Sequence, residues 1–311
     1  MRAGFALALA ACFAASSAHA ATKITLLYTP GDSFTESYVA KDQGIFEKHG
    51  LDVTLTVGQN GSVITAALIA DSAQIGAPTP TVFLQAHEQG VDLVILASAN
   101  RNPVQPAVSE TGIVAREGSG IKTAADLVGK KHAVQGIGGT IDVLTKKWVE
   151  ARGVDYRKVD WIEMQFPMIP DGLKAGLTDA ASVVDPFLHR ILGAKTGYLI
   201  GDFGEVMPAG TMVVVYAATR EWASAHKEAV AAFRAALDDA RTFIENPANA
   251  ATVKASIASY VHLPPQAAAF VQIPANLDSH AVPQGLAFWI ATTREQGLIK
   301  GAPDPASLIA P

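Results

Sequence analysis

Cysteine is almost absent from this sequence. Cys12 is the only cysteine among 311 residues, and it lies in an apolar N-terminal segment that we expect to be removed. A mature chain without it has no disulfide, no thiol nucleophile and no cysteine ligand for a metal. Its stability must then come from packing, for which a hydrophobic fraction of 49% provides ample material.

Clusters of histidine and of basic residues are also missing. The histidines lie on different predicted elements and no His-Glu-x-x-His pair occurs, so we expect neither a metal site nor a cofactor. Basic runs are no longer than the pairs Lys130-Lys131 and Lys146-Lys147, and the net charge is −5. Nucleic-acid binding needs a clustered basic face, and we therefore expect no nucleic-acid partner.

Long apolar runs are confined to the N-terminus. Arg2 is followed by GFALALAACFAA, which is too short to span a bilayer, and then by the small residues of Ala18–Ala20. This arrangement predicts a signal peptide over residues 1–20 and a soluble periplasmic protein. The stretch LAAC also resembles a lipoprotein box that would attach lipid to Cys12, but the segment before it is short for such a signal. We therefore favour the cleavable signal peptide.

The remaining sequence alternates short apolar runs with amphipathic helical patterns, which is typical of α/β folds with mostly parallel sheets. Helical patterns fill the intervals between strands, including 35–50, and a long helix at 220–246 begins a helical C-terminal tail. The pattern restarts near residue 109, which predicts two lobes, 21–108 plus 211–311 and 109–210. The predicted strands are 23–28, 51–57, 73–78, 91–98, 111–116, 131–135, 158–164, 179–184 and 210–218.

A glycine-rich stretch, Gly136–Thr140, precedes a predicted helix. It resembles a nucleotide loop, but the last glycine of a dinucleotide fingerprint and the lysine of a phosphate-binding loop are absent. Glycine still lets free backbone N–H groups at a helix start approach a ligand. We therefore predict that Gly138, Gly139 and Thr140 bind an anion or a carbonyl oxygen. The alternative is a plain strand-to-helix turn with Thr140 as its N-cap.

The stretch GDSFT follows the first predicted strand. It resembles the nucleophile block of SGNH esterases, which would make Ser33 catalytic, but the required Asp-x-x-His is missing. In the closest match, LDSH, Asp278 and His280 are one residue too close. We therefore predict a binding loop, in which Asp32 and Ser33 face the ligand, Asp32 meets a cationic or N–H group and Phe34 stacks on a ring. The alternative is a solvated turn in which Asp32 caps the next helix.

Other candidate residues lie at the carboxyl ends of predicted strands, where open α/β sheets bind ligands. Arg101 is the natural partner for a carboxylate or a sulfonate, or else a surface charge at the crossing between lobes. Asp185 either faces the ligand or caps the helix that begins at Pro186. The ligand-binding residues predicted by this rule are Gln59, Thr79, Asn100, Arg101, Phe166 and Asp185, and Asn60 lies beside the first of them.

Several stretches within Lys23–Leu192 together resemble a family of periplasmic solute-binding proteins, the group that binds sulfonates, taurine, nitrate and pyrimidine precursors. They are ESYVAKDQGIFEKHGLDVTL near the start, TGIVAREGSGIKTAADLVGKKHAV at the crossing and GLKAGLTDAASVVDPF further on. The resemblance implies a two-lobed type II binding-protein fold that closes on a small polar or anionic solute and delivers it to the permease of an ABC transporter. We expect a monomer without enzymatic activity. The alternatives are a Ser33 esterase and a pyrimidine-synthase-like enzyme, which needs a cysteine-rich motif.

Overall fold

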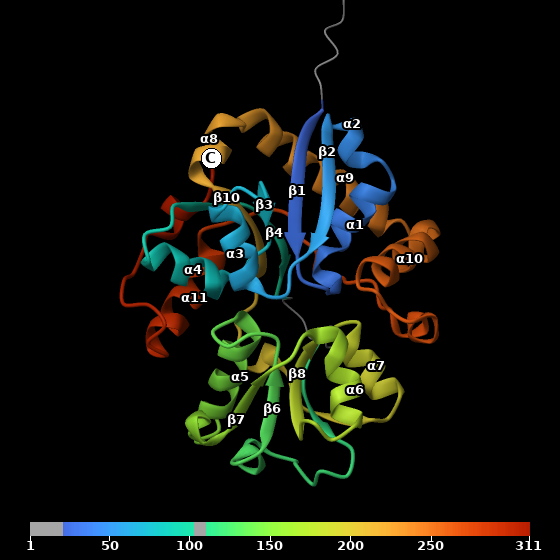
Figure 1. Cartoon of the computed structure of the whole chain (residues 1–311), viewed down its shortest axis with the longest axis vertical. Helices are drawn as coiled ribbons and strands as arrows, with labels where there is room; N and C mark the ends of the chain where they lie inside the picture. Colours follow the sequence, from blue (N-terminus) through green and yellow to red (C-terminus); the bar gives the residue numbers. More distant parts are fainter. Residues whose placement is uncertain (1–20, 103–109) are drawn as a thin grey trace, which may run out of the picture.

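The structure, a computed structural model, describes residues 21–102 and 110–311, and Figure 1 shows them as two α/β lobes, each built on its own sheet. The predicted signal peptide, with Cys12, lies outside the described residues, as does most of the first predicted crossing. Within the described ranges, no helix combines the length and the apolar character needed to cross a membrane. The prediction of a two-lobed α/β fold is confirmed.

Lobe 1 contains a five-stranded sheet in the spatial order β2-β1-β3-β10-β4. Strand β1 pairs in parallel with β2 and β3, whereas β10 is antiparallel to both of its neighbours. The first eight residues of β4 are buried, because helices cover both faces of the sheet. The strands are β1 (Thr22–Tyr28), β2 (Leu51–Val57), β3 (Ile75–Gly76), β4 (Leu93–Arg101) and β10 (Met212–Thr219).

Lobe 2 repeats this arrangement in the order β7-β6-β8-β5-β9, with β5 antiparallel to both of its neighbours. The antiparallel strand of each sheet is the first one after the chain arrives from the other lobe. The other strands end at the edge that faces the opposite lobe, so an arriving strand starts at that edge and runs the opposite way. The strands are β5 (Thr111–Arg116), β6 (Lys131–Val134), β7 (Asp160–Glu163), β8 (Ala180–Val184) and β9 (Gly197–Gly201).

The helices pack around the two sheets, and the C-terminal tail folds back onto lobe 1 (Figure 1). The tail also reaches lobe 2, because Gln296, just after α11, donates from Nε2 to the Val143 carbonyl of α5 at 2.9 Å. The helices of lobe 1 are α1 (Thr35–Asp42), α2 (Ile45–Lys48), α3 (Gly61–Ile69), α4 (Pro80–Glu88), α8 (Arg220–Ala225), α9 (Lys227–Glu245), α10 (Ala250–Tyr260) and α11 (Gln284–Glu295). Those of lobe 2 are α5 (Thr140–Glu150), α6 (Ile169–Lys174) and α7 (Phe187–Gly193).

Three local predictions differ from the structure. The helix predicted at 35–50 breaks into α1 and α2, because Gly44 takes a left-handed conformation with φ +64°. The helix predicted at 220–246 divides at His226 into α8 and α9. The edge strand β9 was not predicted, since a short GYLIG run bounded by glycine carries little strand signal.

Candidate functional site

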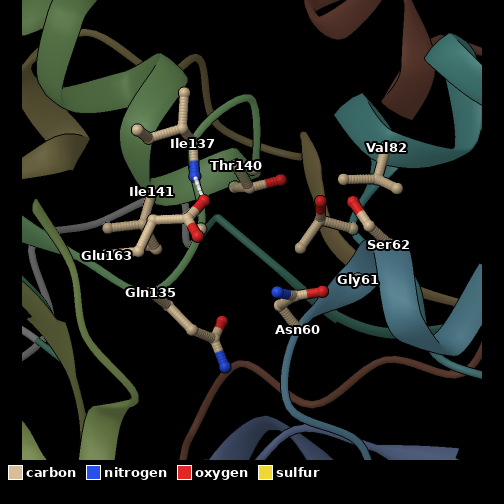
Figure 2. A pocket seen from close by; sticks show the side chains of 12 residues that line it. Asn60, Gly61, Ser62, Val82, Gln135, Ile137, Thr140, Ile141 and Glu163 are labelled. Carbon is tan, nitrogen blue, oxygen red and sulfur yellow. Dashed lines mark hydrogen bonds between the residues drawn. The ribbon is translucent and has the colours of Figure 1, made fainter.

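The carboxyl ends of strands from the two lobes face one another across a narrow pocket (Figure 2). Lobe 1 contributes the N-termini of α3 and α4, and lobe 2 contributes the loop after β6, the start of α5 and the end of β7. The pocket volume is about 30 Å³, which holds water but not an organic solute, so larger molecules enter only when the lobes separate. The lining residues are Asn60, Gly61, Ser62, Thr79, Val82, Gln135, Gly136, Ile137, Gly139, Thr140, Ile141 and Glu163.

The glycine loop before α5 forms the lobe 2 wall of this pocket. Gly138 has φ +80°, and a Cβ at Gly139 would lie 3.0 Å from the carbonyl oxygen of Gly136, so glycine suits both positions. Gln85 of α4 reaches across from lobe 1 and donates from Nε2 to the Gly138 carbonyl at 2.9 Å. The loop is therefore a direct contact between the lobes as well as a wall of the pocket.

Two backbone amides of this loop are bonded to carboxylates of the protein itself. The N–H of Ile137 donates to Glu163 at 2.8 Å, and the N–H of Gly138 donates to Asp142 at 2.8 Å. The N–H of Gly139 also donates, to the Gly136 carbonyl oxygen at 3.1 Å. The prediction of free N–H groups is therefore wrong for Gly138 and Gly139. The donors left at this wall are the amides of the first turn of α5, because a helix leaves its first N–H groups without intrahelical partners.

Thr140 occupies the first helical position of α5, and the N-cap residue is Gly139, so the alternative of Thr140 as N-cap is wrong. Its side chain is buried, with the residue 2% exposed, and Oγ1 has no hydrogen-bond partner among the described residues. In Figure 2 this hydroxyl points across the pocket toward the lobe 1 wall. A buried hydroxyl without a partner that faces a pocket is a candidate solute contact.

The lobe 1 wall consists of two helix N-termini. Thr79 is the N-cap residue of α4, and its hydroxyl lies 3.1 Å from that of Thr81. Asn60 caps α3 by accepting from the Val63 N–H at 3.0 Å through Oδ1. Figure 2 shows the amide nitrogen of Asn60 directed toward lobe 2. Gln59, the predicted residue beside it, is exposed and is not part of the lining.

Among the polar side chains of the lining, three were not named in the prediction. Gln135 follows β6 and falls under the strand-end rule, which therefore had the signal to find it. Ser62 lies one residue inside α3, beyond the turn that the rule singles out. Glu163 is the last residue of β7, and only its long-range bond to the Ile137 N–H reveals its place at the pocket.

A second group of polar residues, of which Asp32, Asn100 and Asp185 were predicted, meets at another contact between the lobes, and we call it the base cluster. It comprises Asp32, Asn100, Glu110, Asp185 and His189. The Asp32 N–H donates to the Asp185 carbonyl oxygen at 3.2 Å, and the Asp185 N–H donates to the Glu110 carbonyl oxygen at 2.8 Å. The Asp185 carboxylate accepts from Nδ1 of His189 at 2.6 Å and from the backbone N–H of His189 at 3.1 Å. Asp185 thus satisfies one N–H of the first turn of α7, although the N-cap residue is Pro186.

Burial shifts the ionisation of this cluster. Desolvation, and then the nearby carboxylates of Asp185 and Glu110, raise the pKa of Asp32 well above its usual range. Burial also raises the pKa of Asp185, and it raises that of Glu110 to about 7. The hydrogen bond to Asp185 raises the pKa of His189. His189 is thus the basic side chain bonded within the cluster.

The two aromatic residues of the predicted site belong to the core. Phe34 is 2% exposed and packs against Tyr28 and Tyr216, with ring centroids 5.8 Å and 6.0 Å away. Phe166 is 4% exposed and stacks on Phe187 at 6.2 Å. Neither ring lines the pocket, so in this structure their role is packing.

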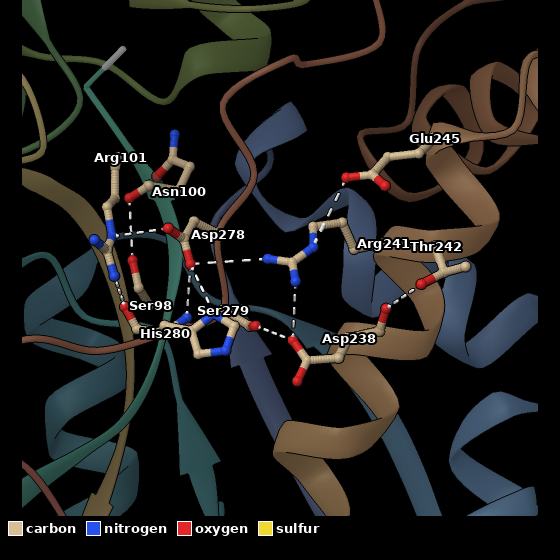
Figure 3. Close-up of polar contacts among 10 residues, drawn as sticks. All are labelled: Ser98, Asn100, Arg101, Asp238, Arg241, Thr242, Glu245, Asp278, Ser279 and His280. Carbon is tan, nitrogen blue, oxygen red and sulfur yellow. Dashed lines mark hydrogen bonds and ion pairs between the residues drawn. The ribbon is translucent and has the colours of Figure 1, made fainter. Parts of the chain in front are cut away.

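Arg101 is engaged in an ion pair rather than free (Figure 3). It lies within β4, which is longer than predicted, and its Nε is 3.1 Å from Oδ2 of Asp278. It also donates to the carbonyl oxygen of His280. Arg241 of α9 lies 3.8 Å from the other Asp278 oxygen. The carboxylate of Asp278 therefore offsets the charge that was predicted to meet an anionic solute.

The esterase alternative gains no support from this geometry. The Ser33 hydroxyl accepts from Nδ2 of Asn100 at 3.1 Å, whereas His280 contacts Asp278 at 3.1 Å on its own segment. A serine without a histidine base is a weak nucleophile. In the part of the chain that the structure describes, no group of three or more His, Cys, Asp or Glu side chains is placed to hold a metal ion.

Sequence comparison places the chain among binding proteins. The profile of the NMT1-like family matches residues 17–258. A nitrate/nitrite binding protein, NrtA of Synechococcus elongatus, is 25% identical over 68% of this chain and 52% of its own length. A putative binding protein of Brucella abortus is 28% identical over 66% of this chain and 61% of its own. The chain thus spans about half to three fifths of the length of these relatives.

Solved structures share the fold. The alkanesulfonate-binding protein SsuA from Xanthomonas axonopodis pv. citri, bound to MOPS, superposes with a TM-score of 0.78 at 18% identity, covering 93% of this chain and 98% of that one. The periplasmic nitrate-binding protein NrtA from Synechocystis PCC 6803 gives 0.77 at 14% identity, over 91% and 84%. These likenesses confirm the binding-protein architecture. Because the family profile also spans most of the chain, the protein belongs to the NMT1-like family.

Proposed function

We propose that this protein is a periplasmic solute receptor that closes two lobes on a small polar molecule and delivers it to an ABC importer. The observation that carries the proposal is the pocket between facing helix N-termini of the two lobes. Helix N-termini present unpaired N–H groups and a positive dipole end to a ligand. The relatives named as nitrate- and sulfonate-binding proteins support the same role.

The lining favours recognition by neutral hydrogen-bonding groups. It combines the hydroxyls of Ser62, Thr79 and Thr140 with the amides of Asn60 and Gln135, and no Lys or Arg is among the described lining residues. Its one carboxylate, that of Glu163, already accepts a hydrogen bond from the Ile137 N–H. Hydroxyls and helix N-termini bind oxygen atoms of a solute without a fixed cation. We therefore expect the pocket to hold a polar, oxygen-bearing part of the solute, such as a carboxylate or a sulfonate.

The direct bonds between lobes support a clamp. Gln85 bonds to Gly138, and Lys147 of α5 lies 2.8 Å from Glu295 of α11. The bond from Gln296 to Val143 and the bond from the Asp32 N–H to the Asp185 carbonyl oxygen also join the lobes. Interfaces between domains are commonly polar and allow relative motion. We propose that lobe 1 is 21–108 plus 211–311, that lobe 2 is 109–210, and that the two crossings act as the hinge.

The proposal is tested by solute binding to the purified protein. Thermal-shift and calorimetric screens with nitrate, sulfonates, carboxylates, pyrimidines and aromatic acids should reveal a solute that binds at about 1:1 and raises the melting temperature. The bound protein should be a monomer with a smaller radius of gyration in X-ray scattering. Failure of every class to bind would argue against the receptor. Hydrolysis of p-nitrophenyl esters that is lost in Ser33→Ala would instead indicate an esterase.

A further inference from the structure

The base cluster places three carboxyl groups at one contact between the lobes. Asp32 lies in the turn after β1, Glu110 directly precedes β5, and Asp185 follows β8. Backbone bonds of 3.2 Å and 2.8 Å tie Asp32 to Asp185 and Asp185 to Glu110. The basic side chain bonded within the cluster is His189, whose Nδ1 lies 2.6 Å from Asp185. When all the carboxyls are ionised, this contact carries an excess of negative charge.

Two buried oxygen atoms of the cluster lack a donor. Oδ2 of Asp32 and Oδ1 of Asn100 have no hydrogen-bond partner among the described residues, and these residues are 2% and 4% exposed. Asn100 is linked to the turn that carries Asp32, because its Nδ2 donates to the hydroxyl of Ser33 at 3.1 Å. The Asn100 oxygen is an acceptor, and the Asp32 oxygen is one when its carboxyl is ionised. The group that satisfies them must therefore donate N–H or O–H bonds.

The nearest arginines are committed elsewhere. Arg101, the residue after Asn100, pairs with Asp278 at 3.1 Å. Arg241 lies 3.5 Å from Asp238 and 3.8 Å from Asp278, and Figure 3 shows both arginines directed at these carboxylates. A metal ion is not favoured either, because the described residues hold no group of three metal-binding side chains. No hydrogen bond from a described side chain reaches the two orphan oxygen atoms.

We propose that the solute carries an ammonium or amino group, and that Asp32 and Asn100 bind this group as the lobes close against Asp185. This inference rests on the proposed receptor function and specifies one end of its solute. The N–H donors satisfy the two orphan acceptors, and a positive charge removes the repulsion between the Asp32 and Asp185 carboxylates across the contact. Protonation of the carboxyls also removes this repulsion, so the lobes should close more easily without solute as the pH falls.

The ionisation of the cluster gives this inference a pH signature. The titratable groups that face Asp32 are Asp185 after β8, Glu110 before β5 and Tyr38 of α1, with His189 of α7 behind Asp185. The pKa of Glu110, at about 7, means that this carboxyl is partly protonated near neutral pH, and burial also raises the pKa values of Asp32 and Asp185. Binding of a cation favours the ionised carboxyls. It should therefore release protons, and affinity should rise with pH.

The first test compares solutes that differ only by an amino group, with calorimetry at about pH 8. The pairs are 2-aminoethanesulfonate with ethanesulfonate, 3-aminopropanoate with propanoate, and 4-aminopyrimidine with pyrimidine. We expect an amino member to bind at least about tenfold more tightly than its partner, as a charge-assisted bond provides. Asp32→Asn should abolish this preference, whereas Asp52→Asn, at an exposed position on β2, should keep it. Equal affinity within pairs that bind overturns the inference and leaves the receptor function intact.

The second test needs no solute. The radius of gyration of the unliganded protein should decrease between about pH 8 and about pH 5, as protonation removes the repulsion across the contact. Asp32→Asn should be equally compact at both values, and Asp52→Asn should follow the wild type. A wild-type radius that does not change with pH overturns the inference, whether or not any solute binds. Failure of all six compounds to bind counts against the receptor proposal, and the scattering result then decides this inference by itself.

Discussion

Glu36 provides a quantitative test of the packing in lobe 1. It lies in the first turn of α1 and is completely buried, and neither of its carboxylate oxygens has a hydrogen-bond partner among the described residues. Burial raises its pKa to about 9, and the charge of Arg241 offsets this only in part. Glu36 is therefore neutral in the folded protein near pH 7 and ionised in the unfolded chain.

The sign and size of its effect follow from linkage. Between the ordinary value of 4.5 and about 9, the folded state binds one more proton than the unfolded state, so the free energy of unfolding falls as pH rises. The slope is about 1.4 kcal/mol per pH unit. From about pH 5 to about pH 7 this amounts to a loss of about 3 kcal/mol. Glu36→Gln removes the titrating group and keeps the shape of the side chain, so the variant should not show this loss.

Urea unfolding at several pH values measures the effect. The stability difference between Glu36→Gln and wild type should shift in favour of the variant by about 3 kcal/mol between about pH 5 and about pH 7. Glu47→Gln is the control, since Glu47 is largely exposed and its hydrogen bond to Lys41 lowers its pKa. That variant should show a small change of opposite sign. Parallel pH profiles for Glu36→Gln and wild type would refute the assignment of a neutral buried Glu36.

Three further variants test the site. Thr140→Val should weaken solute binding about tenfold by removing one hydroxyl, without lowering the melting temperature. The control, Thr178→Val, removes another buried unpaired hydroxyl at the far end of β8 and should leave solute affinity unchanged. Equal solute affinities for the two variants would place Thr140 outside the site. Gln85→Ala should increase the radius of gyration of the unliganded protein in X-ray scattering, because the substitution removes the bond to Gly138. An unchanged radius of gyration would show that this bond does not hold the lobes together. Arg101→Ala should lower the melting temperature and leave solute affinity unchanged, because the partner of Arg101 is Asp278. A large loss of solute affinity would indicate that Arg101 binds the solute after all.

Local patterns were sufficient for the architecture. Apolar runs of strand length alternate with amphipathic stretches, and each such element depends on residues that are neighbours in the sequence. The rule that ligands lie at strand ends found Thr79 at the pocket and Asn100 and Asp185 in the base cluster. The glycine-rich stretch added Thr140 at the pocket, and the GDSFT stretch added Asp32 in the base cluster. The two-lobed arrangement followed from the restart of the same alternation after the fourth strand.

Side-chain roles were harder to predict because they depend on partners far away in the chain. Arg101 appeared to be a free cation until Asp278, from the C-terminal tail, was placed beside it. The glycine loop appeared to offer free amides, but Glu163 from the next strand takes one of them. Phe34 has the polar neighbours of a surface turn in sequence, yet the fold packs it between tyrosines from two other elements.

The sequence by itself determined the α/β alternation, the two-lobed plan and the stretches shared with periplasmic binding proteins, because these depend on local periodicity and on chain order. Only the tertiary structure decided which carboxylates remain without a donor and which cations are already paired. Charge compensation is a short-range property in space, and the residues that compensate one another here come from separate strands and lobes. That is why the chemistry of the solute, unlike the fold, could be argued only after the strand ends had been brought together.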